Sequence, residues 1–107
     1  MKMIEELEDG RLLLKVDKTI YDKECVLASV YKFTGTCYIH IESIDSNHYG
    51  VYFLRKNPDI DLISQVDSFS NELIDQQVRQ NLDRSNKSIK EMIVKKAFFP
   101  FQGNDHQ

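Results

Sequence analysis

Apolar residues alternate with polar ones in three separate segments of this 107-residue chain. A period of two is typical of a strand that buries one face. The first strand is expected to follow Gly10, the second to cover residues 36–44 and the third to cover residues 49–55. Turn-forming residues 45–48 favour an antiparallel hairpin between the last two. The alternating apolar residues are Leu12, Leu14, Val16, Cys37, Ile39, Ile41, Tyr49, Val51 and Phe53.

Two further segments have the apolar spacing of helices. Asp22 is a predicted N-cap, because its short carboxylate can accept a free backbone N–H, and that helix is expected to run to about Thr34. Gly35 then fits the left-handed residue after a helix end. A long helix is expected from about Asp61 to Asp83. Its predicted inner stripe is Val66, Phe69, Ser70, Leu73, Ile74, Gln77 and Val78.

A third helix is expected near the C-terminus. Residues 84–86 interrupt the apolar pattern, and Ser88 and Glu91 have the spacing of a capping box. The residues expected on one face of this helix are Ile89, Met92, Ile93 and Ala97. Pro100 is expected to end it.

These elements predict an α+β fold with two layers. We expect a three-stranded sheet, in the order β-α-β-β-α-α, with the helices on one face. The length suits one domain over residues 1–107. Residues 1–9 are expected to be an acidic, flexible lead-in with at most a short helical turn, and residues 102–107 a flexible tail.

Charge and hydropathy exclude several classes of protein. A net charge of −3 disfavours a nucleic-acid binder, which usually carries a strong basic excess. No run approaches about 18 apolar residues, so no membrane-spanning helix is expected. The acidic N-terminus is unlike a secretory signal, which makes the cytoplasm the expected location. Residues 84–96 carry five bases and one acid. That stretch is interpreted as a solvated helix face, with contact to RNA or an acidic protein as the alternative.

Little in the sequence indicates catalysis or a metal site. Cys25 and Cys37 are expected to be free thiols, as in most cytoplasmic proteins. Cys37 and His40 are three residues apart on a predicted strand, so they point to opposite faces and cannot bind one ion. Motifs for nucleophilic catalysis or phosphate binding are missing. We therefore expect no catalytic residues, no metal and no cofactor.

The second face of the predicted sheet is the most informative surface. Tyr38, His40, Tyr52 and Leu54 are expected to point away from the helices, and Leu13 is expected beside them. Aromatic residues on an uncovered face favour a dimer or partner interface. The alternative is that the acidic lead-in or the C-terminal tail covers this face. The tail residues concerned are Phe98, Phe99 and Phe101.

Several segments in order resemble the HxsD family, small proteins of His-Xaa-Ser peptide maturation systems. The most specific is the run from Phe69 to Arg79, FSNELIDQQVR. The others are VDKTIY from Val16, the segment from Val26 that ends YKFT at Thr34, CYI from Cys37, and Ile89–Phe98. The resemblance covers roughly residues 12–99.

The resemblance implies an accessory role beside radical S-adenosylmethionine proteins and a precursor with His-Xaa-Ser repeats. Two cysteines cannot supply the three ligands of a radical-enzyme iron–sulfur cluster, so the radical chemistry belongs to another protein. The polar members of the matching run form a strip that either binds a partner or packs against neighbouring elements. They are Asn71, Glu72, Asp75, Gln76 and Arg79.

The sequence therefore predicts a non-catalytic accessory protein that binds the precursor peptide or a radical S-adenosylmethionine partner. One alternative is a homodimeric interaction module that buries its sheet face against a second copy. The other is a small thiol-dependent enzyme that uses Cys25 or Cys37.

Overall fold

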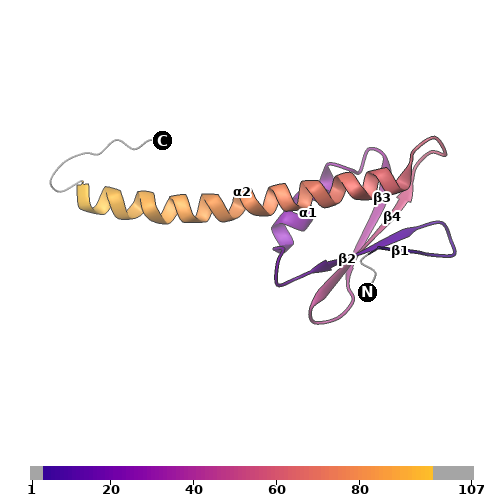
Figure 1. Cartoon of the computed structure of the whole chain (residues 1–107), viewed down its shortest axis with the longest axis horizontal. Coiled ribbons are helices and arrows are strands. Elements are labelled where there is room, and N and C mark those ends of the chain that lie inside the picture. Colours follow the sequence, from indigo (N-terminus) through magenta and orange to yellow (C-terminus); the bar gives the residue numbers. More distant parts are fainter. Residues whose placement is uncertain (1–3, 98–107) are drawn as a thin grey trace. The chain divides into compact units, whose positions relative to one another are not determined.

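The structure, a computed structural model, describes the backbone of residues 4–97 and the side chains of residues 4–85. The described elements are β1 (Ile4–Glu6), β2 (Leu12–Asp17), α1 (Lys23–Tyr31), β3 (Cys37–Ser43), β4 (His48–Arg55) and α2 (Leu62–Ala97) (Figure 1). The chain divides after Gln77 into two compact units. The sheet, α1 and the beginning of α2 form the first unit, and the second begins at Val78.

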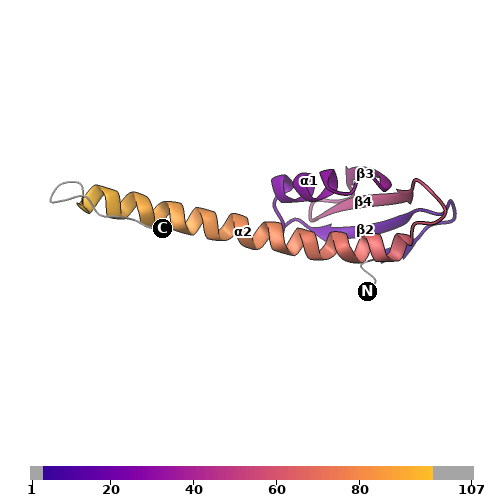
Figure 2. The same cartoon turned by 90° about the horizontal axis from the view of Figure 1, so that it is seen from above.

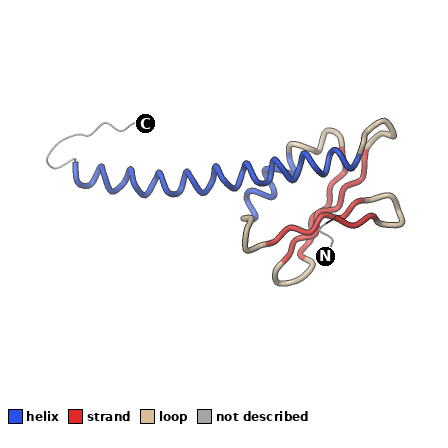
Figure 3. The backbone as a smooth tube through the Cα atoms, in the orientation of Figure 1, coloured by secondary structure: helices blue, strands red, loops and turns tan. Residues whose placement is uncertain are grey.

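The four strands form one antiparallel sheet in the order β1-β2-β4-β3. The predicted α+β class and the antiparallel hairpin of β3 and β4 are confirmed. The predicted number of strands is wrong, because the structure has four strands instead of three. β1 and β3 are therefore the outer members of the sheet, whose strands are red in Figure 3.

The additional strand, β1, lies in the segment predicted as a flexible lead-in or helical turn. A tight turn joins it to β2: Leu7 N–H donates to the Arg11 carbonyl at 2.9 Å, and Gly10 N–H donates to the Leu7 carbonyl at 3.1 Å. Gly10 has φ +88°, which glycine adopts without the steric cost of a Cβ atom. With only three residues, β1 is too short for alternation to reveal it.

The core lies between one face of the sheet and the two helices (Figure 2). Alternate residues of β2, β3 and β4 point into it, as predicted. Phe69 of α2 is fully buried and meets Phe53 edge to face, with ring centroids 5.1 Å apart. The buried core residues are Leu12, Leu14, Val16, Cys25, Val26, Cys37, Val51, Phe53, Leu62, Val66, Phe69 and Leu73.

Helix α1 begins at the predicted place and ends earlier than predicted. Asp22 is its N-cap, but the carboxylate makes no capping hydrogen bond. The helix ends at Tyr31 instead of Thr34, and Gly35 does not have a positive φ. Successive backbone bonds, such as Phe33 N–H to the Val30 carbonyl at 2.9 Å, satisfy the last carbonyls instead. These tight turns remove the need for a left-handed residue.

Helix α2 is one helix where two were predicted. It continues through residues 84–86, and residues 88–91 lie inside it instead of at a helix start. Serine and asparagine lower helix propensity only slightly, so their presence is weak evidence for a break. Within the predicted inner stripe, Ile74 and Val78 are half exposed and therefore do not belong to the core.

Among residues 4–97, neither helix combines the length and the apolar composition of a membrane span. The predicted tail, residues 102–107, and the phenylalanines at 98, 99 and 101 lie outside the described residues. The side chains of most of the basic stretch 84–96 also lie outside them.

Candidate functional site

The sheet face opposite the helices carries the residues that the alternation predicted there. In the β3–β4 register, Tyr38 pairs with Leu54 and His40 pairs with Tyr52. All four point to the face opposite Cys37, Ile39 and Phe53, which turn toward the core. We call Tyr38, His40, Tyr52 and Leu54 the outer patch. Tyr38 is 60% exposed and Leu54 is 37% exposed.

Glu42 contacts two residues of the outer patch, His40 on β3 and Tyr52 on β4. Tyr52 OH donates to Glu42 Oε2 at 3.0 Å, and His40 Nε2 lies 3.2 Å from Glu42 Oε1. The imidazole and phenol rings are 5.7 Å apart, and the Arg11 guanidinium lies 4.9 Å from the Tyr52 ring centroid. These contacts hold Tyr52 in one orientation.

The electrostatics of the outer patch follow from these bonds. Hydrogen bonds from His40 and then Tyr52 lower the pKa of Glu42 below its ordinary 4.5. The same bond raises the pKa of Tyr52 above its ordinary 10.0, because it stabilises the protonated phenol. At neutral pH Glu42 is therefore a carboxylate beside the outer patch, and Tyr52 is a neutral phenol.

The outer face is partly closed at one end by Ile44. Leu13 lies opposite Tyr52 on β2, as expected, but it is only 7% exposed. A Cβ atom at Gly50 would lie 2.8 Å from the Ile44 side chain and 3.2 Å from Leu13 Cδ1. Ile44 therefore occupies the space above Gly50, beside Leu13.

A shallow depression of about 330 Å³ adjoins the other end of the outer patch, at Leu54. Lys56, which also lines it, places its ammonium group 5.1 Å from the Tyr38 ring centroid and donates to the Thr34 carbonyl at 2.6 Å. The residues that line the depression are Asp9, Gly10, Leu54, Arg55, Lys56, Asn57 and Pro58. The outer patch thus borders a recess with a mixed polar and apolar lining.

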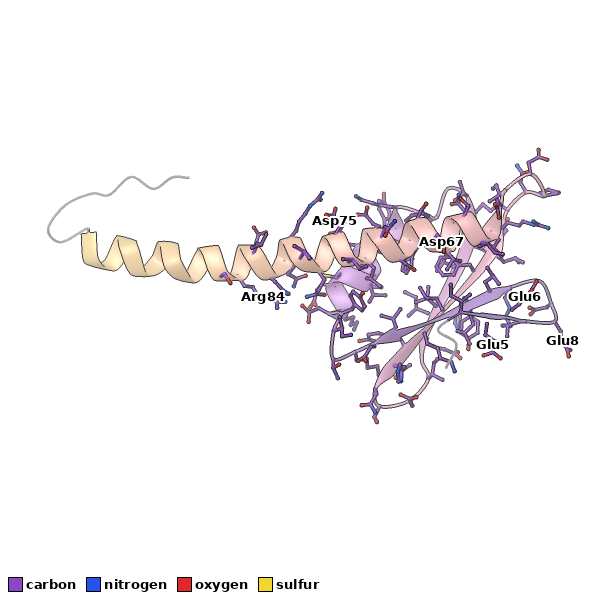
Figure 4. All side chains as sticks on the ribbon, in the orientation of Figure 1. Glu5, Glu6, Glu8, Asp67, Asp75 and Arg84 are labelled. Carbon is purple, nitrogen blue, oxygen red and sulfur yellow. The ribbon has the colours of Figure 1, made fainter. Side chains whose placement is uncertain are left out.

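The polar strip on α2 divides into packing residues and exposed residues. Lys32 Nζ lies 2.8 Å from Glu72 Oε2, and Gln76 Nε2 donates to the same oxygen at 2.8 Å. Glu72 therefore connects α2 to the end of α1, and Gln76 holds the Glu72 carboxylate from within α2. Asn71, Asp75 and Arg79 are exposed, and Asp75 lies on the side of α2 turned away from the sheet (Figure 4). Within the first unit, residues 71–76 of this strip lie on the helix that packs on the core face of the sheet, opposite the outer patch.

A buried polar side chain next to this strip is one that the sequence assigned only to the apolar stripe. Gln77 is 7% exposed, donates to Asp22 Oδ2 at 3.0 Å and accepts from Asp22 N–H at 2.8 Å. This reciprocal pair fixes the start of α1 on α2. In the sequence, the signal for this contact is a glutamine within an apolar stripe. Its partner, Asp22, is 55 residues away, so the sequence does not reveal the pair.

The cysteines and histidines do not assemble a reactive centre within residues 4–85. Cys25 and Cys37 are 2% and 1% exposed, and burial raises the pKa of the Cys37 thiol. Cys37 faces the core, whereas His40 faces outward, as the spacing predicted. Among the described residues, no group of three or more histidine, cysteine or acidic side chains could hold a metal ion.

Comparison with known proteins identifies the family. A family model described as His-Xaa-Ser system protein HxsD matches residues 16–104, which is most of the chain. The chain belongs to the HxsD family. Neither the curated proteins nor the solved structures gave a match.

The residues that match the HxsD family model include most elements of this fold. It begins at Val16 in β2 and includes β3, β4 and both helices, so it contains the whole outer patch. Helix α2 contains the run from Phe69 to Arg79, the most specific of the segments that resemble HxsD proteins. Phe69 and Leu73 of that run are core residues, Glu72 connects α2 to the end of α1, and Gln76 bonds to Glu72. Much of this motif therefore serves the fold.

Proposed function

We propose that this HxsD-family chain is a non-catalytic accessory protein that binds a peptide or protein of a His-Xaa-Ser maturation system through the outer patch. The observation that carries the proposal is the exposed pair of Tyr38 and His40 beside Leu54, on the sheet face opposite the core that α1 and the beginning of α2 cover. The partner is the precursor peptide or a radical S-adenosylmethionine protein of the same system.

The chemistry of the outer patch suits recognition. Tyrosine and arginine are enriched at protein interfaces, since each combines a large contact area with hydrogen-bonding groups. Tyr52 is already oriented by Glu42 and Arg11, so binding immobilises fewer free side chains. The depression beside Leu54 can accept a partner side chain next to the aromatic surface.

Burial of both cysteines favours this proposal over a thiol-dependent enzyme. A reactive thiol needs access to its substrate and a lowered pKa. The Cys37 pKa is raised instead, and Cys25 is as deeply buried. If Cys25→Ser and Cys37→Ser variants lose peptide maturation while they remain folded and still bind the partner, the non-catalytic assignment is wrong.

The test is titration calorimetry of the purified chain with the precursor peptide and with each modifying enzyme, first separately and then together. Tyr38→Ser is the informative variant, because Tyr38 is exposed and its loss leaves the core intact. We expect at least about a tenfold weaker Kd, the effect of losing an aromatic interface residue worth about 1.4 kcal/mol.

Tyr31→Ser is the matched control, since Tyr31 is 79% exposed on α1 and lies outside the outer patch. It should bind like the original chain. If both substitutions weaken the Kd equally, or if neither weakens it, the outer patch is not the binding surface. If no component of the system binds, the proposed function is wrong.

A homodimer that buries the outer patch is the competing assignment. In that case Leu54→Ser would lower the molar mass in light scattering without any partner present, because Leu54 belongs to the outer patch but lies on the inner strand β4. A mass that does not change with this substitution favours the accessory role.

A further inference from the structure

Strand β3 lies at the edge of the sheet and is paired on one side only among the described residues. It has seven residues, whereas the opposite edge strand, β1, has three. Exposed edges are usually shortened or blocked by proline, lysine or a bulge. β3 contains neither proline nor lysine and pairs with β4 in an unbroken register from Cys37 to Ser43. Such an edge can accept another strand.

The hydrogen bonds at both ends of the β3–β4 pair show which way the backbone N–H and C=O groups of β3 point. Lys56 N–H donates to the Thr36 carbonyl, and Ile44 N–H donates to the His48 carbonyl. Because hydrogen-bonded pairs alternate along an antiparallel ladder, even-numbered residues of β3 bond to β4. The N–H and C=O groups of Ile39 and Ile41 therefore point to the open edge.

The sequence of β3 suits antiparallel pairing with β3 of a second copy when the pair is centred on His40. In an antiparallel pair of two copies centred there, Ile39 lies opposite Ile41 of the second copy, and the two form reciprocal backbone bonds. Both side chains are half-buried at the margin of the core, so the pairing covers apolar surface that is still exposed.

Charge supports the same register on the outer face. Tyr38 lies opposite Glu42 of the second copy, and the ammonium group of Lys56 lies 5.1 Å from the Tyr38 ring. The pairing therefore brings the carboxylate of one copy near the ammonium group of the other. A tyrosine hydroxyl already donates to Glu42 within one chain, which shows that this carboxylate can accept such a bond.

We propose that β3 pairs with β3 of a second copy in antiparallel orientation about His40, so that two four-stranded sheets become one continuous sheet. The two outer patches then lie side by side on one face. This dimer uses the sheet edge and leaves the outer patch open, so it is distinct from a dimer that buries that patch.

The test is light scattering of the full chain over a range of concentrations up to hundreds of micromolar. We expect the molar mass to rise from 12.6 kDa toward twice that value. Ile41→Pro should abolish the increase, because it removes a donor from the open edge and none from the β4 ladder. Glu6→Pro is the matched control. Since Leu7 bonds to Arg11, the Glu6 N–H also points away from the sheet, but on β1.

Tyr38→Glu is a second variant that should prevent the pairing. It places a carboxylate opposite Glu42 of the other copy and leaves the backbone hydrogen bonds unchanged. Circular dichroism checks that each variant is folded, and Tyr38→Glu alone decides the outcome if Ile41→Pro does not fold. Loss of the dimer in the folded β3 variants and its retention in Glu6→Pro would support the proposal. A chain that stays monomeric, or a dimer that survives the β3 substitutions, would overturn it.

Discussion

At the scale of single residues, the fold depends on polar contacts between elements that are far apart in sequence. Asp22 and Gln77 exchange two hydrogen bonds, and Lys32 binds Glu72. Both contacts join α1 to α2. Lys32 is about half exposed, so its ion pair adds little stability, whereas Gln77 is buried and its loss leaves Asp22 N–H without that acceptor.

Replacing Gln77 is therefore expected to be costly. Gln77→Ala should lower the free energy of unfolding by about 1–3 kcal/mol, the usual cost of leaving a buried polar group unsatisfied. Urea unfolding followed by circular dichroism measures the change. Gln76→Ala, one position away and only half-buried, should cost about 0.5 kcal/mol or less. Equal losses for the two variants would contradict the role given to the Gln77–Asp22 pair.

Four carboxylates with lowered pKa values give a prediction about how stability depends on pH. Asp9, Asp17, Glu42 and Asp45 all have pKa values below their ordinary ones in the folded chain. The unfolded chain therefore binds more protons in the acidic range, and the free energy of unfolding falls as pH falls through and below the ordinary values of 3.8 and 4.5. Urea unfolding at a series of pH values measures this decrease.

The contribution of Glu42 can be separated by substitution. Glu42→Gln keeps an acceptor for Tyr52 and removes the titrating carboxylate. This variant should lose less stability on acidification than the original chain. A decrease of the same size in both proteins would show that the bonds from His40 and Tyr52 do not stabilise the Glu42 carboxylate.

At the scale of elements, one glycine determines the β1–β2 hairpin. Gly10 has φ +88°, whereas Gly35 has no positive φ, and no atom lies within 4 Å of the position that a Cβ atom would take there. Gly10→Ala should cost about 1 kcal/mol, because a Cβ atom is strained in the left-handed region. Gly35→Ala should be nearly neutral. Thermal unfolding of both variants tests this, and the reverse order of stabilities would contradict the assignment of the turn.

Alternation and helical spacing predicted the elements whose patterns are long. β2, β3, β4 and the start of α1 lie where the sequence placed them, because each pattern reports a buried face directly. β1 was missed because three residues carry no period. The continuation of α2 through Ser85 was missed because propensity is a weaker determinant than the context of a long helix. Gly35 was misassigned because tight turns satisfy the end of α1 equally well.

At the scale of the whole molecule, the sequence predicted which residues lie on the outer face but not what holds them there. Tyr38, His40, Tyr52 and Leu54 follow from alternation alone. Their contacts with Arg11 and Lys56 depend on strand order and register, which a single sequence does not reveal. Burial of Leu13 depends on Ile44, which follows β3, and on the missing side chain at Gly50.

Recognition through the outer patch is the central claim, and side-chain NMR of the full chain tests it most directly. The partner is the component of the system that binds in calorimetry. As it is added, the signals of the Tyr38 and Tyr52 rings, the His40 imidazole and the Leu54 methyl groups should shift, while the Tyr31 ring on α1 should not. Shifts confined to Tyr31 and other residues outside the outer patch would contradict the account.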